Sequence, residues 1–259
     1  VVLVFLIAPI LAIVPLSFNA EPYFSYPMPG LSLKWYDDFF NNDRWRLALQ
    51  TSLVLAFLVT ILSTVLGTLA ALGLSRGNIP GRPLILGLLI SPMIVPVIIT
   101  AVAVLLAYGT LSNATGFQLI GRLSGLVLAH TVLATPFVVI TVTSTLTGFD
   151  WNLARAGASL GAPPVTVFGK VIFPLILPGI ISGAMFAFVT SFDEVVVATF
   201  ISSPEQRTLP KQMFAGIREQ ISPTITAAAT VLVLLSTFLL VGAELLRRRS
   251  ERLRGVSPS

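Results

Sequence analysis

Two adjacent acids interrupt an apolar stretch at Ser191-Phe192-Asp193-Glu194. A charge inside a membrane span costs about 2.5–3.5 kcal/mol on insertion scales, and such groups usually face a cavity or a partner. Acids in a low-dielectric passage favour a positively charged solute. If residues 179–200 form one helix, the two acids point about 100° apart, so that one faces a passage and the other a neighbouring helix. The alternative is a helix that ends early and leaves both acids in water outside the membrane.

No sequence motif indicates covalent chemistry on this chain. The sequence has no G-x-x-x-x-G-K-[ST] loop, so it cannot bind and hydrolyse ATP in the P-loop manner, and it has neither G-x-S-x-G nor H-E-x-x-H. It contains no cysteine, which excludes disulfides and thiolate metal sites. The single histidine, His130, lies in an apolar run, where a packed, hydrogen-bonded role is usual. We expect no enzyme activity, no metal site and no cofactor on this chain.

The long segment after residue 149 carries the signals of two short helices joined by a sharp turn. Asp150 is suited to cap a helix over residues 151–160, because its carboxylate can accept the free N–H groups of the first turn. Gly161 follows where a left-handed residue would end that helix. Pro163 and Pro164 lie where a second helix would begin, since a first-turn residue does not need its N–H.

This segment resembles the EAA loop of inner-membrane permease subunits of binding-protein-dependent ABC importers. The family pattern is Glu-Ala-Ala, three residues, Gly, nine residues, then Ile-x-Leu-Pro. The matching positions here are Arg155-Ala156-Gly157, Gly161 and Val171-x-Phe173-Pro174. Both spacings hold, but Arg155 replaces the glutamate and Gly157 the second alanine, so a salt bridge of that glutamate is not carried over.

In that family the loop docks on a separate ATPase subunit, which holds the ATP and magnesium. The resemblance therefore implies a cytoplasmic coupling loop over residues 148–174. Its implied ATPase-coupling residues are Arg155, Ala156, Gly157, Gly161, Ala162, Pro163, Val165 and Phe168. The alternative is an amphipathic cytoplasmic loop without a partner.

The composition indicates an all-α membrane protein. Hydrophobic residues make up 55% of the 259 residues and charged ones 10%, whereas a soluble domain is about a quarter charged. We expect one transmembrane domain over residues 1–259, in which Pro92 and Pro96 kink the third span. The six expected spans cover about 1–18, 47–75, 84–108, 123–146, 179–200 and 224–246. The resemblance implies that they adopt the type I ABC importer permease (MetI-like) architecture.

The charges predict the orientation of the chain. Six spans place both termini on one side, where the segments carry nine basic and three acidic residues, against seven basic and eight acidic ones on the other side. Basic residues accumulate on the cytoplasmic side, so we expect a bacterial inner-membrane protein with both termini in the cytoplasm. The net charge of +5 fits this bias better than nucleic-acid binding. The sequence starts inside an apolar run, and we expect that residues before Val1 are missing from it.

A second resemblance concerns the substrate. The segments SFDEVVVATFISSPEQRTLPKQMF and LSLKWYDDFF are similar to the spermidine/putrescine branch of the same permease family. This implies import of a small cationic solute along a route lined by Ser191, Asp193 and Glu194. Trp35 is a further candidate, although an interfacial anchor explains it equally well.

The implied partners are an ABC ATPase dimer, an identical or different sister permease, a periplasmic substrate-binding protein and the lipid bilayer. An alternative substrate in the same architecture is an amino-acid derivative, an opine or iron. A more remote alternative is a secondary transporter, which would need its own ion site and usually internal repeats.

Overall fold

The computed structural model of the chain describes residues 2–75, 79–219 and 222–253, and these residues form helices and connecting loops, with a single isolated β-bridge between Asn19 and Leu31. The predicted all-α fold class is confirmed. The α-helices are α1 Val2–Leu16, α2 Lys34–Asn41, α3 Asp43–Ser75, α4 Arg82–Ile94, α5 Val97–Thr115, α6 Leu123–Thr147, α7 Trp151–Ser159, α8 Pro164–Val167, α9 Phe173–Phe192, α10 Val196–Ile201, α11 Leu209–Glu219 and α12 Pro223–Leu253. A π-helix, η1 Phe168–Ile172, joins α8 to α9, and a 3-10 turn, η2 Pro204–Gln206, precedes α11.

Among the described residues, five helices are long and apolar enough to cross a membrane. They are α3, α5, α6, the continuous helix Pro164–Phe192, and the part of α12 over Pro223–Gly242. The first expected span corresponds to α1, whose 15 residues are fewer than the roughly 20 that a span typically needs.

Two expected spans differ from the observed helices. The third is divided into α4 and α5 at Val95, whose backbone is extended because the next residue, Pro96, disfavours a helical conformation there. Pro92 instead stays inside α4. The prediction of one helix over residues 179–200 is wrong at both ends, since the helix starts earlier and stops at Phe192, and a separate α10 follows.

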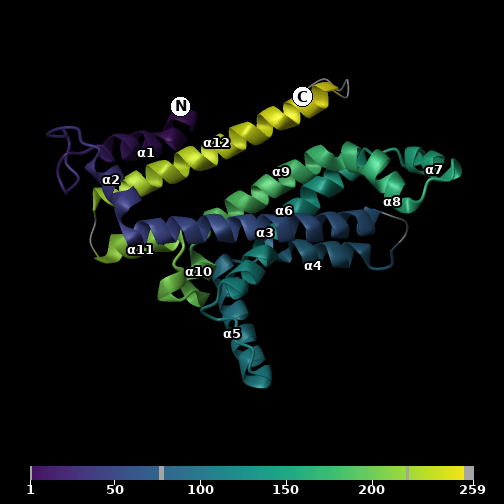
Figure 1. The fold of residues 1–259 in the computed structure, drawn as a ribbon, viewed down its shortest axis with the longest axis horizontal. Helices are drawn as coiled ribbons and strands as arrows, with labels where there is room; N and C mark the ends of the chain where they lie inside the picture. The colour runs from purple at the N-terminus through teal and green to yellow at the C-terminus, as the bar shows by residue number, and fades with distance from the viewer. Residues whose placement is uncertain (1, 76–78, 220–221, 254–259) are drawn as a thin grey trace.

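The core is built by α3, α6 and α9, which lie side by side along the middle of the molecule (Figure 1). Small residues let these helices approach closely, as is usual where helices pack in membranes. A Cβ added to Gly67 of α3 would come within 2.6 Å of the Val138 Cβ of α6. A Cβ on Gly183 of α9 would come within 2.9 Å of the Val138 Cα. The helix contacts therefore leave no room for a methyl group at these points.

Several of the remaining helices lie at the two ends of the α3–α6–α9 bundle, and α5 projects from it. The α7–α8 pair lies at one end of the bundle, where α3 ends and α4 begins, and α2 and α11 lie at the other end (Figure 1). Helix α5 projects away from the bundle, and only 6% of its span is buried. Its described contacts are chiefly with α10. Of the basic residues used to predict the orientation, Arg76 and Arg254 lie outside the described residues.

Candidate functional site

The α7–α8 turn has the predicted local structure. The N–H of Asn152 donates to the Asp150 carboxylate over 2.9 Å, so Asp150 caps α7 as expected. Gly161 has φ +83°, in the left-handed region. The N–H of Ala162 donates to the carbonyl of Gly157, and that of Gly161 to the carbonyl of Ala158. These two bonds form a Schellman motif, which ends α7 with its last carbonyls satisfied.

The second short helix starts at the two prolines. Pro163 is the N-cap of α8 and Pro164 its first residue. From Pro164 the helix runs through η1 and α9 without a break to Phe192, 29 residues in all. The turn is therefore attached directly to a helix of the core.

Large apolar side chains are exposed at this turn. Leu160 is 89% exposed and Val165 is 81% exposed. The backbone cap fixes the positions of both residues, and Arg155 and Ala156 are exposed on the same helix pair. Phe168 and Ala162 differ from the exposed predicted coupling residues, because both are half-buried and pack against the core. Leu160 was not among the predicted coupling residues, although its position directly before Gly161, at the predicted end of the helix, can be read from the sequence.

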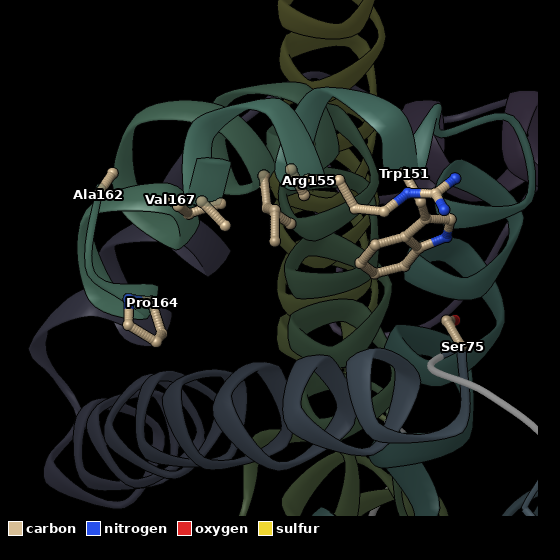
Figure 2. A pocket seen from close by; sticks show the side chains of 9 residues that line it. Ser75, Trp151, Arg155, Ala162, Pro164 and Val167 are labelled. Atoms are coloured by element: carbon tan, nitrogen blue, oxygen red, sulfur yellow. The ribbon is translucent and has the colours of Figure 1, made fainter. Parts of the chain in front are cut away.

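A cleft of about 560 Å³ opens between the helix pair and the end of α3. Figure 2 shows Arg155 and Trp151 on α7, Pro164 and Val167 on α8, and Ser75 on α3. The walls are mainly apolar, and the charged group among the lining residues is the guanidinium of Arg155. That guanidinium donates to the Asn152 side-chain oxygen over 2.6 Å. The cleft thus presents a cation where the family pattern has a glutamate.

The second region is the break between α9 and α10. Helix α9 ends at Phe192 with Asp193 as its C-cap, and α10 begins at Val196. The two carboxylates differ because the chain turns there, not because of a 100° helical offset. Asp193 is exposed, whereas Glu194 is buried, with 9% of its surface accessible. The early end of the helix was the alternative that the sequence left open, but only one of the two acids reaches solvent.

The Glu194 carboxylate caps α10 from inside the protein. One oxygen accepts the N–H of Val197 over 2.7 Å, and the other accepts the N–H of Ala198 over 3.0 Å. A carboxylate that bonds to two free N–H groups of a helix start is favoured both by hydrogen bonding and by the helix dipole.

Two buried side chains of the core complete this arrangement. His130, on α6, places its Nε2 atom 3.4 Å from Glu194 Oε2. Its Nδ1 atom lies 3.1 Å from the hydroxyl oxygen of Ser191 on α9. His130 is 0% exposed and Ser191 3% exposed. The predicted packed, hydrogen-bonded state of His130 is confirmed, but its partners could not be read from the sequence.

The C-terminal end of α10 is held by a cation. The Lys211 ammonium on α11 donates to the carbonyls of Ala198 and Ser202 and, over 2.7 Å, to the Ser202 hydroxyl. Burial, and then the nearby Arg207, lower the pKa of Lys211. A carboxylate at the first turn and an ammonium at the last complement the dipole of this six-residue helix.

Trp35 is not brought to the break. It lies on α2, where its indole N–H donates to the Asn19 carbonyl over 2.6 Å. The Lys34 ammonium stands 4.6 Å from its ring centroid. Both contacts belong to the N-terminal segment, whereas Ser191, Asp193 and Glu194 lie together around the break.

The apolar helix bundle, with the exposed helix pair at one end, is that of a multi-span membrane protein. Residues 63–252 match the family described as the inner membrane component of binding-protein-dependent transport systems, and the chain belongs to that family.

Its similarity to individual relatives extends over nearly the whole chain. It is 35% identical to the spermidine/putrescine transport system permease protein PotC of Haemophilus influenzae, over 96% of this chain and 95% of the relative. It is 34% identical to the putrescine transport system permease protein PotI of Escherichia coli K12, over 88% and 82%. A bacterial ABC transporter involved in the import of the acidic polysaccharide alginate matches with a TM-score of 0.72 at 15% identity, covering 95% of this chain and 91% of that chain. This last likeness concerns the fold alone, which is the type I importer permease fold that the sequence predicted.

Proposed function

We propose that this chain is the transmembrane permease subunit of an ATP-driven importer for a small cationic solute, with a polyamine such as spermidine or putrescine as the first candidate. A separate ATPase dimer supplies the energy, and it carries the ATP and magnesium. The observation that carries this proposal is the rigid helix pair at one end of the bundle, where Leu160 and Val165 are exposed.

The helix pair has the properties of a docking surface. Exposed leucine and valine side chains gain free energy when a partner covers them, about 25 cal/mol per Å² of apolar surface buried. The Asp150 cap and the Gly161 turn hold them in one geometry, so little ordering is needed on binding. We assign this surface to the ATPase, together with the cleft beside Arg155.

The same surface is connected to the carboxylates. The continuous helix from Pro164 to Phe192 is roughly 43 Å long at 1.5 Å per residue, and it ends beside Asp193 and Glu194. A displacement of the helix pair on ATP binding therefore moves the start of the break as well. This connection supports a mechanism in which the ATPase switches the access of the solute route.

The acid at the break supports a cationic substrate. Asp193 is exposed, and a carboxylate beside an apolar span favours a cation over an anion. The names of the relatives PotC and PotI point to the same class of solute.

The remaining partners follow from the family description and from the charges. A periplasmic binding protein delivers the solute, and a sister permease completes the route beside the exposed α5. The excess of basic residues on the side of the termini supports a bacterial inner-membrane orientation with both termini in the cytoplasm. The helix pair then faces the ATPase in the cytoplasm.

Reconstitution tests this proposal. The chain is purified with its co-expressed ATPase, sister permease and binding protein, and proteoliposomes are assayed for uptake of radiolabelled spermidine. We expect uptake that requires ATP and the binding protein. The Leu160→Asp variant should lose the ATPase during purification, whereas Leu153→Asp, at a less exposed position of α7, should retain more of it.

Two results would contradict the proposal in different ways. Spermidine uptake without ATP or an ATPase subunit would indicate a secondary transporter. A complex that hydrolyses ATP but takes up neither spermidine nor putrescine would still be an importer, but one with another substrate.

A further inference from the structure

A buried polar chain connects α6 with both sides of the helix break. It runs from the Ser191 hydroxyl to the two ring nitrogens of His130 and on to the Glu194 carboxylate, with separations of 3.1 Å and 3.4 Å. His130 and Ser191 are 61 residues apart in the sequence. All three residues are at most 9% exposed, so each polar atom without a partner costs free energy.

The geometry favours one arrangement of protons among Ser191, His130 and Glu194. If Nδ1 carried the proton of a neutral imidazole, the lone pair of Nε2 would face a carboxylate oxygen, which is repulsive. If Nε2 carries it, the N–H points toward Glu194 Oε2 and Nδ1 accepts the hydroxyl proton of Ser191. The distance of 3.4 Å from His130 Nε2 to Glu194 Oε2 is too long for an ordinary hydrogen bond. The Glu194 oxygen nevertheless interacts electrostatically with the Nε2 N–H.

We propose that His130 is a positioning residue: with Ser191 it holds Glu194 inside the protein as the cap of α10, which removes Glu194 from the solute route and leaves Asp193 as the exposed carboxylate of the break. The part that concerns the solute rests on the proposed function. The two adjacent acids then have separate tasks, since one fixes the backbone and the other is free to meet a cation.

The position of His130 suits this task. Its helix, α6, packs against both α3 and α9 in the core, so the ring is anchored to the most buried part of the bundle. Glu194 uses both oxygens on the N–H groups of Val197 and Ala198, which leaves it little capacity for a solute. Drawing Glu194 out would leave the N–H groups of Val197 and Ala198 without this acceptor and would take away the oxygen nearest to His130 Nε2.

Cysteine labelling tests which acid faces the water. The chain has no cysteine, so single-cysteine variants need no other change. Asp193→Cys and Glu194→Cys are assembled with the full importer in proteoliposomes and treated with a cationic methanethiosulfonate reagent. We expect labelling of Asp193→Cys to be about tenfold faster than that of Glu194→Cys, because thiol reactivity follows exposure. Equal rates, or faster labelling at Glu194→Cys, would overturn the proposal.

Substitutions of His130 test the positioning role without touching either acid. His130→Leu removes both ring nitrogens, and His130→Gln keeps an amide N–H within reach of Glu194. We expect His130→Leu to raise the KM for spermidine about fivefold, as the loss of one polar contact predicts, and His130→Gln to restore most of it. An equal KM for His130→Leu and the native chain, or no difference between the two variants, would contradict the assignment.

A double variant separates positioning from packing. In a Glu194→Gln background, His130→Leu should change the KM by less than about twofold, because residues in one network are not additive. Additive changes in KM would show that His130 acts independently of Glu194. The labelling contrast does not depend on spermidine being the solute, so a failure of uptake would count against the proposed function while the labelling still decides the role of Glu194.

Discussion

Helix α9 is continuous with α8, and the two interruptions at the ends of this long helix are made in opposite ways. At the α7–α8 turn the backbone itself makes the interruption, through the left-handed Gly161, Pro163 and Pro164, and the side chains beside it are exposed. At the α9–α10 break none of residues 193–195 has a positive φ, and the buried side chain of Glu194 holds the geometry. The first kind of interruption exposes the surface that we assign to the ATPase, and the second kind sets the positions of two carboxylates.

The comparison predicts that the α7–α8 turn is sensitive to backbone change. Gly161→Val forces a β-branched residue into φ +83°, at a cost of about 1–3 kcal/mol, although an added Cβ would meet nothing within 4 Å. We expect the largest effect here, a loss of roughly tenfold in spermidine transported per ATP hydrolysed.

Gly169→Val is the matched control for Gly161→Val. Gly169 also has open space around it, but its φ is not in the left-handed region. Similar coupling ratios in the two variants would show that the left-handed backbone is not what matters. Both ratios are measured in the reconstituted complex.

The break should be sensitive to charge instead. Asp193→Asn keeps the size of the side chain and removes its charge, so we expect the KM for spermidine to rise about fivefold, as for an exposed ion pair of about 1 kcal/mol. Assembly with the ATPase should be unchanged, as measured by gel filtration. An unchanged KM would show that the Asp193 charge does not interact with the solute.

A smaller effect is expected from the cap of α7. Asp150→Ala removes the acceptor for the Asn152 N–H and should destabilise α7 by about 1 kcal/mol. Hydrogen exchange of the α7 amides measures this change, and Asp150→Asn serves as the control because asparagine also caps helices. Equal protection in Asp150→Ala and the native chain would show that the Schellman turn alone holds the helix.

The smallest effect is expected at the far end of α10. Lys211→Met removes the ammonium that donates to Ala198 and Ser202 while keeping an unbranched side chain. We expect a loss of about 0.5 kcal/mol, seen as faster exchange of the last α10 amides. A loss of stability larger than that caused by Asp150→Ala would show that the ammonium at the end of α10 contributes more than the cap of α7.

The contrast also explains what the sequence could predict. Asp150, Gly161 and the two prolines act on their immediate neighbours, so the rules of helix ends located the turn correctly. At the break Glu194 lies beside His130, which is 64 positions away in the sequence (194 − 130), and no local pattern in the sequence indicates that pairing. The division of the third span could be predicted only in part. Pro96 indicates a break in the helix, but Pro92 is an equally strong indication and stays inside α4.

The exposure of individual residues was the hardest property to predict. Val165 and Phe168 looked equivalent in the family pattern, yet one is exposed and the other packs against the core. Helical phase decides between them, and it depends on where α8 begins and on the π-helix that follows. Neither is visible from hydrophobicity alone.

That π-helix has one more consequence. The N–H of Phe173 reaches back five residues to the carbonyl of Phe168, so η1 holds one surplus residue compared with an α-helical turn. A π-turn takes up its surplus residue by widening, so deleting one residue in η1 would leave the exposed Val165 facing nearly the same way relative to the core face of α9. The direction in which this surface faces is therefore expected to tolerate the gain or loss of one residue at η1.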